Sequence, residues 1–368
     1  METLITSNRR HWIDNLRWIT ILIVVIFHIF FFYNDIGVSP MFVKPGSQTE
    51  SVKYTFAGIF QYSVYQWFMA LLFVVSGICA KYTLQKKTLR QFLKDRTRKL
   101  LVPGTLGVLC VHWIAGWLES SMFMPEDVPL PVKLVVSFLS GTGGLWFCHV
   151  LIIACVVLAL IKVLDKNNRL EALGEKSNML ILIFLYPVML GAAQILNVPM
   201  VTTYRMCYYP VSFLAGYYIF SSEKLLAQLK KFGWIFLIPA AVACYFYIKK
   251  FYGVNYSSYE VLNDWLSILF TWLMIAGIIS LAQNVLDFEN KFSAYMNSVG
   301  WGIYINHITL MIIINYFLRP YTSQLSMLSI YTIEFSSAMI LSIALWELLK
   351  RVPVLRYVLY GIKGNKNA

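Results

Sequence analysis

Residues 18–34 read WITILIVVIFHIFFFYN, a run without a charged side chain. As a helix rising 1.5 Å per residue, this run is nearly long enough to cross the roughly 30 Å of hydrocarbon in a bilayer. It is long and bulky, and no small-residue cleavage site follows it in residues 31–35. We therefore interpret it as a membrane span and not as a cleaved signal peptide.

The rest of the chain has the composition of an integral membrane protein. Of its 368 residues, 58% are apolar and 13% are charged, and the mean hydropathy is +0.63. Soluble proteins carry about 25% charged residues. The composition excludes a soluble globular enzyme, a disordered chain and a coiled coil.

Uncharged runs of similar length recur along the sequence. They predict an all-α, polytopic membrane protein of about ten transmembrane helices with no soluble domain, because barrel strands alternate in polarity and these runs do not. We expect a single domain over residues 1–368, with its core at about 10–350. The predicted spans are 18–34, 54–80, 100–118, 134–161, 177–204, 206–222, 232–248, 265–286, 292–318 and a weaker tenth at 328–349.

The net charge of +13 is consistent with this topology and gives no reason to expect a nucleic-acid partner. With a cytoplasmic N-terminus, 24 of the 31 Lys and Arg residues fall in segments on the cytoplasmic side. Basic residues accumulate on that side of membranes. We expect both termini in the cytoplasm, loops near 34–59 and 119–143 outside, and contact with anionic membrane lipid.

The first span carries ionisable residues on one face. His28 lies eleven positions after Arg17, which is 20° beyond three full helical turns and about 16 Å along the axis. Asp14 lies three residues before Arg17 and can pair with it. An ionisable side chain at a helix centre costs roughly 2.5–3.5 kcal/mol on insertion, which favours a functional role over a packed histidine and a snorkelling arginine.

Asp-x-x-Arg followed by ten residues and His, in the first of ten helices, resembles the first-helix motif of acyltransferase family 3. Members of this family are membrane acyltransferases that modify envelope glycans and related molecules. Further motifs occur in the order and spacing of the family, although Lys99 stands where the family has the second Arg of Arg-x-x-Arg. These motifs are Ser76-Gly77, the basic stretch 92–99 before Pro103, Leu145-Trp146-Phe147, Phe213 to Gly216, Ser298 with Tyr304 and His307, and Trp346-Glu347 with Pro353.

The resemblance implies an O-acyltransferase of the plasma membrane, such as a bacterial inner or cell membrane. Its co-substrate would be cytoplasmic acyl-CoA, with acetyl-CoA as the expected donor, and it would hold no bound cofactor. The acceptor would be a hydroxyl of an envelope glycan, a lipid or another small molecule. No C-x-x-C pair occurs among the six cysteines, so no metal site is expected.

The residues and the resemblance together assign candidate roles. The planar guanidinium of arginine suits phosphate, and imidazole can accept a proton or carry an acyl group. For His307, a functional role and a packing role remain equally open, while His149 and His112 are expected to be structural. The catalytic candidates are His28, Arg17 and Asp14; the donor-binding candidates are Arg96, Arg98, Lys99 and Ser76; the substrate-binding candidates are Trp146, Tyr304 and His307.

A transporter or flippase that uses the same polar stripe is the alternative. Transporters of this kind show interrupted helices at matching positions in two halves of the chain. Pro187, Pro199 and Pro210 cluster around the fifth and sixth spans without a counterpart elsewhere. This asymmetry favours the enzyme.

Overall fold

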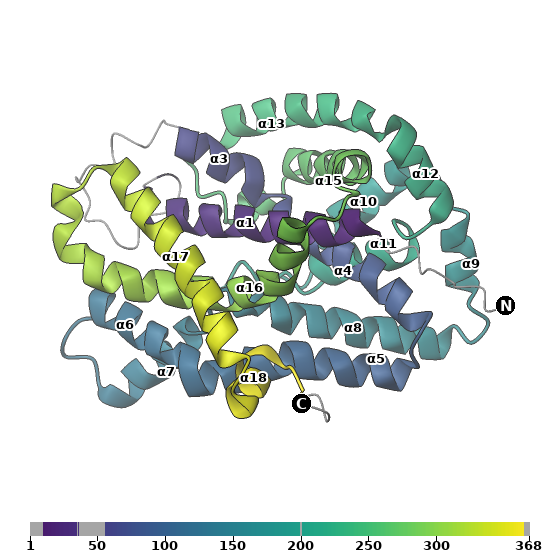
Figure 1. Cartoon of the computed structure of the whole chain (residues 1–368). Helices are drawn as coiled ribbons and strands as arrows, with labels where there is room; N and C mark the ends of the chain where they lie inside the picture. Colours follow the sequence, from purple (N-terminus) through teal and green to yellow (C-terminus); the bar gives the residue numbers. More distant parts are fainter. Residues whose placement is uncertain (1–9, 35, 37–55, 199–200, 364–368) are drawn as a thin grey trace.

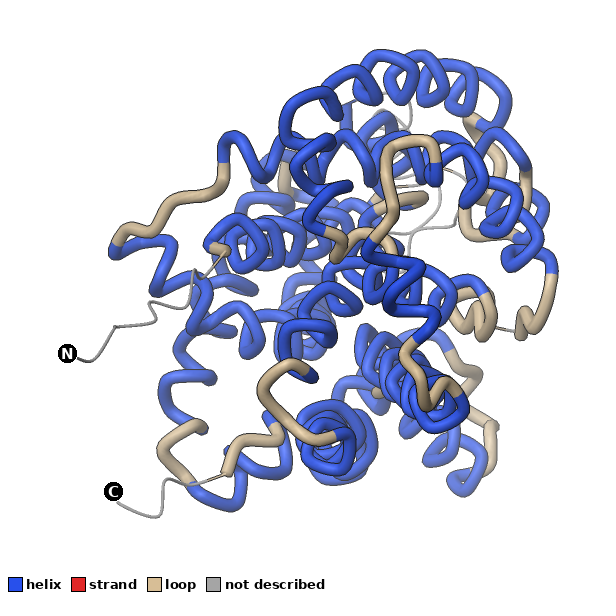
Figure 2. Tube along the Cα trace, turned by 90° about the vertical axis from the view of Figure 1, so that its right-hand side faces the viewer, coloured by secondary structure: helices blue, strands red, loops and turns tan. Residues whose placement is uncertain are grey.

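The structure is a computed structural model that describes residues 10–34, 36, 56–198 and 201–363. Within these ranges the chain consists of helices and connecting loops (Figure 2). They contain no sheet, and the single antiparallel bridge among them joins Asn197 to Arg205. The predicted all-α class is confirmed. The predicted loop at 34–59 lies mostly outside the described residues.

Within the described residues, eight helical segments are long and apolar enough to span a membrane, as a polytopic membrane protein requires. The segments are α1 (His11–Tyr33); α3 (Phe56–Tyr65) with α4 (Phe68–Leu84); α5 (Leu89–Arg96), which continues through the π-helical η1 (Thr97–Leu101) and η2 (Pro103–His112) into α6 (Trp113–Phe123); η3 (Gly143–Leu145) with α8 (Trp146–Leu164); α12 (Glu223–Phe232) with η4 (Gly233–Phe236) and α13 (Leu237–Phe251); α15 (Trp265–Val285); α16 (Lys291–Leu318) with η5 (Arg319–Gln324); and α17 (Met327–Leu349).

The fifth and sixth predicted spans form shorter helices than expected. They correspond to α10 (Ile181–Gln194) and α11 (Tyr208–Tyr218), which have 14 and 11 residues. A helix that crosses the bilayer perpendicular to its plane needs about 20 residues. The chain leaves α10 at Leu196, whose φ of 54° is incompatible with a continuing right-handed helix. The remaining helices are α7 (Leu130–Ser140), α9 (Arg169–Glu175), α14 (Tyr259–Leu262) and α18 (Pro353–Tyr360).

The predicted span 134–161 is divided between α7 and α8. The chain turns between these helices at Gly143, whose φ of 41° suits a residue without a side chain. α7 instead packs against α6, where a Cβ on Gly116 would lie 2.0 Å from the carbonyl oxygen of Ser137. The apolar residues before the turn therefore belong to a helical hairpin, and the predicted outer loop 119–143 contains a helix.

Helix α1 runs through the middle of the bundle (Figure 1). It contacts α3, α4, α15, α16 and α17. Its neighbour α4 is buried at every residue from Phe68 to Val75. A helix that is apolar all round is typical of such an interior position. The middle of α1 is therefore surrounded by other helices.

Two motif glycines allow α4 and α11 to pack closely. A Cβ on Gly77 would lie 2.0 Å from the carbonyl oxygen of Phe213, and a Cβ on Gly216 would lie 2.0 Å from that of Val74. Small residues let the backbones of membrane helices approach one another in this way. Both glycines therefore serve helix packing, which in turn holds the inner face of α4 in place.

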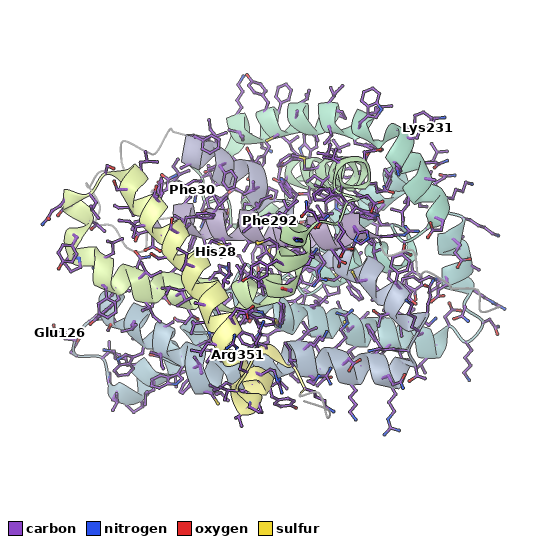
Figure 3. All side chains as sticks on the ribbon, in the orientation of Figure 1. His28, Phe30, Glu126, Lys231, Phe292 and Arg351 are labelled. Atoms are coloured by element: carbon purple, nitrogen blue, oxygen red, sulfur yellow. The ribbon has the colours of Figure 1, made fainter. Side chains whose placement is uncertain are left out.

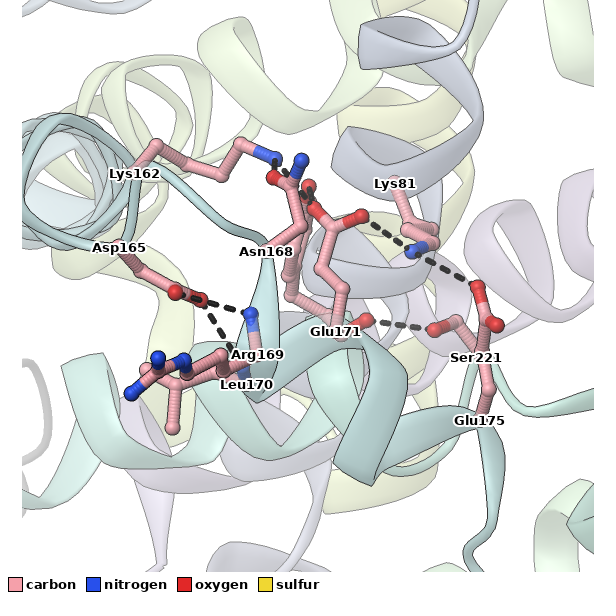
Figure 4. A network of polar contacts seen from close by, with 10 residues as sticks. Lys81, Lys162, Asp165, Asn168, Arg169, Leu170, Glu171, Glu175 and Ser221 are labelled. Atoms are coloured by element: carbon pink, nitrogen blue, oxygen red, sulfur yellow. Dashed lines mark hydrogen bonds and ion pairs between the residues drawn. The ribbon is translucent and has the colours of Figure 1, made fainter.

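Ion pairs join four helices at the end of the bundle where α1 begins and α4 and α8 end, which we call the basic end. Glu171 of α9 accepts hydrogen bonds from Lys81 at 2.9 Å and Lys162 at 2.6 Å, and another from the Tyr217 hydroxyl (Figure 4). Burial by itself raises the pKa of Glu171, but these hydrogen bonds outweigh burial and lower the pKa to about 2. The carboxylate therefore stays ionised and holds α4, α8, α9 and α11 together.

Candidate active site

A cavity of about 540 Å³ lies toward the basic end, between α1, α4, α5, α8 and α16. Five of the candidate residues from the sequence line it, although they come from four separate membrane-length segments. They are Arg17, Ser76, Arg96, Lys99 and Tyr304. The structure thus brings together residues of the second and ninth predicted spans with basic residues that lie just before the first and third spans.

Cationic side chains line one part of this cavity. Arg17 is about half exposed, at 49%, and its Nη1 lies 3.9 Å from Oδ1 of Asp14 on the preceding turn. Arg96 and Lys99 line the same space. Lys87 joins them there, paired with Asp95; sequence reasoning did not single it out from the other basic residues of its loop. The excess of positive charge suits a ligand with several phosphates.

Arg98 is placed differently from its basic neighbours. Its guanidinium donates to the Asp95 carboxylate at 3.1 Å and to the Gly361 carbonyl at 3.0 Å, and it does not line the cavity. Gly361 has a φ of 63°, and a Cβ there would lie 2.2 Å from the carbonyl oxygen of Arg98. Arg98 therefore anchors the end of α18, whose Tyr360 lines the cavity.

His28 lies on α1 beyond the cavity-lining residues Arg17 and Ile21, in the interior between Lys231 and Glu126 at opposite ends of the molecule (Figure 3). Its Nδ1 is 2.8 Å from the carbonyl oxygen of Val24. Since a carbonyl can only accept, Nδ1 carries the hydrogen and Nε2 presents a lone pair. The ring is half-buried. His28 can therefore act as a base or a nucleophile through Nε2.

His307 packs edge to face against His28. The two ring centroids are 5.2 Å apart with an interplanar angle of 62°. His307 Nδ1 lies 2.7 Å from the carbonyl oxygen of Tyr304, so its Nε2 also presents a lone pair. His307 is buried, and its Nε2 has no hydrogen-bond partner among the described residues. The sequence placed both imidazoles inside the membrane but contained no local signal that they meet.

Tyr304 lies between the cavity and the two histidines. Its ring lines the cavity and is 5.9 Å from the His307 ring. Its hydroxyl donates to the carbonyl of Gly144 in the turn before α8. A Cβ on Gly144 would lie 3.7 Å from Cε1 of His307, so this turn also packs against the histidine. Tyr304 therefore links the turn at η3 to the site.

Trp146 does not line the cavity, in contrast to its neighbour Phe147. The Trp146 ring is half-buried and lies 5.4 Å from Tyr209 and 6.4 Å from Tyr204. These contacts place Trp146 in an aromatic cluster beside the cavity. The structure thus separates Trp146 from the donor-binding candidates.

The two histidines expected to be structural are held by other parts of the bundle. His149 donates from Nε2 to the Gly104 carbonyl at 2.8 Å, and its Nδ1 is 2.9 Å from the Tyr204 hydroxyl. His112 is buried, with Nδ1 2.6 Å from the Thr309 hydroxyl. Neither lines the cavity described above. Among the described residues, no three His, Cys, Asp or Glu side chains converge as metal ligands would.

Comparison with known proteins identifies one family. The family model for the acyltransferase domain matches residues 10–347. No curated protein and no solved structure matches the chain. The matched range contains the cavity-lining candidates and both facing histidines, and it ends before α18.

Proposed function

This chain belongs to acyltransferase family 3 and is a membrane-bound acyltransferase, and we propose that it transfers an acetyl group from cytoplasmic acetyl-CoA to a hydroxyl of an envelope glycan, a lipid or another small acceptor. Membership in the family decides between the enzyme and the transporter that the sequence left open. We further propose that it lies in a bacterial plasma membrane with both termini in the cytoplasm, as the distribution of basic residues favours.

One observation carries the proposal: Tyr304 lines the cavity with the cations and packs against His307, and His307 packs against His28. Arg17, Arg96 and Lys99 line the cavity, and His28 lies about 16 Å beyond Arg17 along α1. In acyl-CoA the phosphates and the thioester are joined by the long pantetheine arm. If the phosphates bind at these cations, the pantetheine arm can extend through the cavity toward His28.

The roles of the residues follow from this arrangement. Asp14 orients Arg17 at the donor end, and Ser76 lines the path of the arm. His28 accepts either the proton of the attacking hydroxyl or the acyl group itself. We propose that Trp146, Tyr304 and His307 contact the acceptor side of the site. Each route moves one proton, in net terms, from the acceptor hydroxyl to the departing CoA sulfur.

The experiment is to incubate the purified protein with acetyl-CoA labelled in the acetyl group and an envelope extract. We expect label to appear in a glycan or lipid of the extract. His28→Ala should lower this transfer by about 10²-fold or more, as loss of a general base or nucleophile does.

His149→Ala is the matched control, because His149 is a half-buried histidine held by Gly104 and Tyr204 away from the cavity. It should keep most of the activity. Near wild-type transfer by a well-folded His28→Ala protein would contradict the proposed role of His28. Absence of transfer by the wild type to any component of the extract would contradict the proposed donor or acceptor class.

A further inference from the structure

His28 and His307 face each other in the same tautomeric form. Each ring is held through Nδ1–H by a carbonyl of its own helix, that of Val24 for His28 and that of Tyr304 for His307. Both neutral rings therefore carry the lone pair on Nε2. Neither Nε2 has a hydrogen to donate. A reaction that uses both nitrogens can use them only as nucleophile or base.

The two rings differ in exposure. His28 is half-buried, whereas His307 is 1% exposed. A thioester carbonyl is bulky and suits the more exposed of the two rings, which is that of His28. A proton taken from a hydroxyl needs only the approach of one small group, which suits the more enclosed His307.

The unpartnered Nε2 of His307 points to a missing hydrogen-bond donor. A buried acceptor without a partner has lost its hydrogen bond to water and gained none in return, which is unfavourable. A substrate hydroxyl bound at this nitrogen would replace the lost hydrogen bond. Since the ring centroids are 5.2 Å apart, an acyl group on one ring lies within contact distance of the other. A hydroxyl bound at His307 would then face the acyl carbon.

We propose, on the basis of the function proposed above, that His28 carries the acyl group and that His307 is the base that deprotonates the acceptor. In the first step the lone pair of His28 Nε2 attacks the thioester carbon, the C–S bond breaks, and CoA leaves as a thiolate. In the second step the acceptor oxygen bonds to the acyl carbon while its proton moves to His307 Nε2. The C–N bond breaks and its electron pair returns to His28. His307 then releases the proton, and the CoA thiolate becomes a thiol.

The two half-reactions can be measured separately on the full-length protein. Formation of an acyl-enzyme makes the protein exchange labelled CoA into acetyl-CoA in the absence of any acceptor. Transfer of labelled acetyl to an envelope extract reports both steps together. We expect His307→Gln to exchange CoA within about threefold of the wild type while transfer falls by about 10²-fold or more. His28→Gln should lose both.

His112→Gln is the matched control, because His112 is another buried histidine whose Nε2 has no partner among the described residues, and it does not face His28. It should retain exchange and transfer. A purely structural role of His307 would lower both rates together, and this result would overturn the proposal. Unchanged transfer in His307→Gln would overturn it too, as would wild-type transfer without CoA exchange.

The same measurements distinguish this inference from the proposed function. A wild type that neither exchanges nor transfers would contradict the acetyl-CoA-dependent function itself. A wild type that transfers but whose His307→Gln variant also transfers leaves the function standing and removes only the role of His307. Loss of exchange in His307→Gln with exchange retained in His28→Gln would reverse the two roles and so contradict them.

Discussion

At the scale of single residues, Arg17 is the cation of α1 that lines the cavity in which we propose that the donor binds. Its side chain is about half exposed, and its ion pair with Asp14 spans 3.9 Å. We predict that Arg17→Ala and Arg96→Ala each weaken acetyl-CoA binding about 10- to 100-fold, because a hydrogen bond to a charged group contributes about 1.5–3 kcal/mol. Titration of the purified variants with acetyl-CoA measures the effect.

Arg90→Ala provides the control for general loss of positive charge. Arg90 belongs to α5, as Arg96 does, but it is exposed and does not line the cavity. Its replacement should leave the affinity within about twofold of the wild type. Equal affinities for acetyl-CoA in Arg17→Ala, Arg96→Ala and the wild type would exclude the proposed phosphate contacts.

Sequence reasoning worked at this scale where the signal was local. Asp14 and Arg17 pair because they lie three residues apart on one helix, which the sequence shows directly. It could not separate Arg98 from Arg96, because the π-helical geometry of η1 and the distant Gly361 decide which side chain faces the cavity. It also could not bring His28 to His307, since that contact depends on the packing of two helices far apart in the chain.

At the scale of elements, the close packing of α4 on α11 depends on the absence of side chains. A Cβ on Gly216 would lie 2.0 Å from the carbonyl oxygen of Val74. This oxygen is a backbone atom, so it cannot move aside as the end of a flexible side chain could. We predict that Gly216→Ala forces the helices apart and lowers the free energy of unfolding by about 1–3 kcal/mol, the usual cost of overpacking. Thermal unfolding of the detergent-solubilised protein measures this as a lower apparent Tm.

Gly191→Ala is the control variant at a loosely packed position. Gly191 lies inside α10, and a Cβ there would have nothing within 4 Å. Alanine favours a helix by about 1 kcal/mol over glycine, so this variant should be as stable as the wild type or slightly more stable. A Gly216→Ala protein as stable as Gly191→Ala would show that the two helices are not held as closely as described.

The carboxylate that joins α4, α8, α9 and α11 gives a pH-dependent prediction. The pKa of Glu171 is lowered to about 2 from its usual value of 4.5. Its stabilising effect is therefore complete above about pH 4.5 and is lost as the pH falls toward 2. We predict that Glu171→Gln lowers the apparent Tm at pH 7 and that the difference from wild type shrinks as the pH falls below 4.5.

Glu175→Gln is the control for this experiment. Glu175 belongs to the same short helix and lies 3.7 Å from Lys81, but its side chain is 69% exposed. An exposed ion pair contributes at most about 1 kcal/mol. Its loss should change the apparent Tm little at any pH. A Glu171→Gln protein with the stability of Glu175→Gln at pH 7 would contradict the role assigned to the network.

The elements also show where sequence patterns mislead. Residues 134–161 form one uncharged run, which predicts a single span. The structure turns at Gly143, so the first part of the run packs in a hairpin with α6. Hydropathy alone cannot distinguish a helix that spans from one that pairs with its neighbour, whereas the glycines at 141, 143 and 144 carried a signal for a break.

At the scale of the whole molecule, the charges gather at one end of the bundle. Lys81 and Lys162 meet at Glu171, and Lys87 lines the cavity with the other cations of that end. Glu126 lies at the opposite end (Figure 3). Basic residues accumulate on the cytoplasmic side of membrane proteins, so the orientation that we propose puts the basic end in the cytoplasm. That orientation also gives cytoplasmic acyl-CoA direct access to the cavity.

We therefore predict that a cysteine at Lys87 is protected from a membrane-impermeant thiol reagent in intact cells and reacts after the cells are permeabilised. A cysteine at Glu126, which is exposed, should react in intact cells. Both variants are made in a background without the six native cysteines, because Cys110 is exposed and would add its own signal. Retained acetyl transfer would verify the fold of that background.

Labelling of Lys87→Cys and protection of Glu126→Cys in intact cells would show that the topology is the reverse of the one proposed. The cavity would then open away from the cytoplasm, and cytoplasmic acyl-CoA could not be the donor.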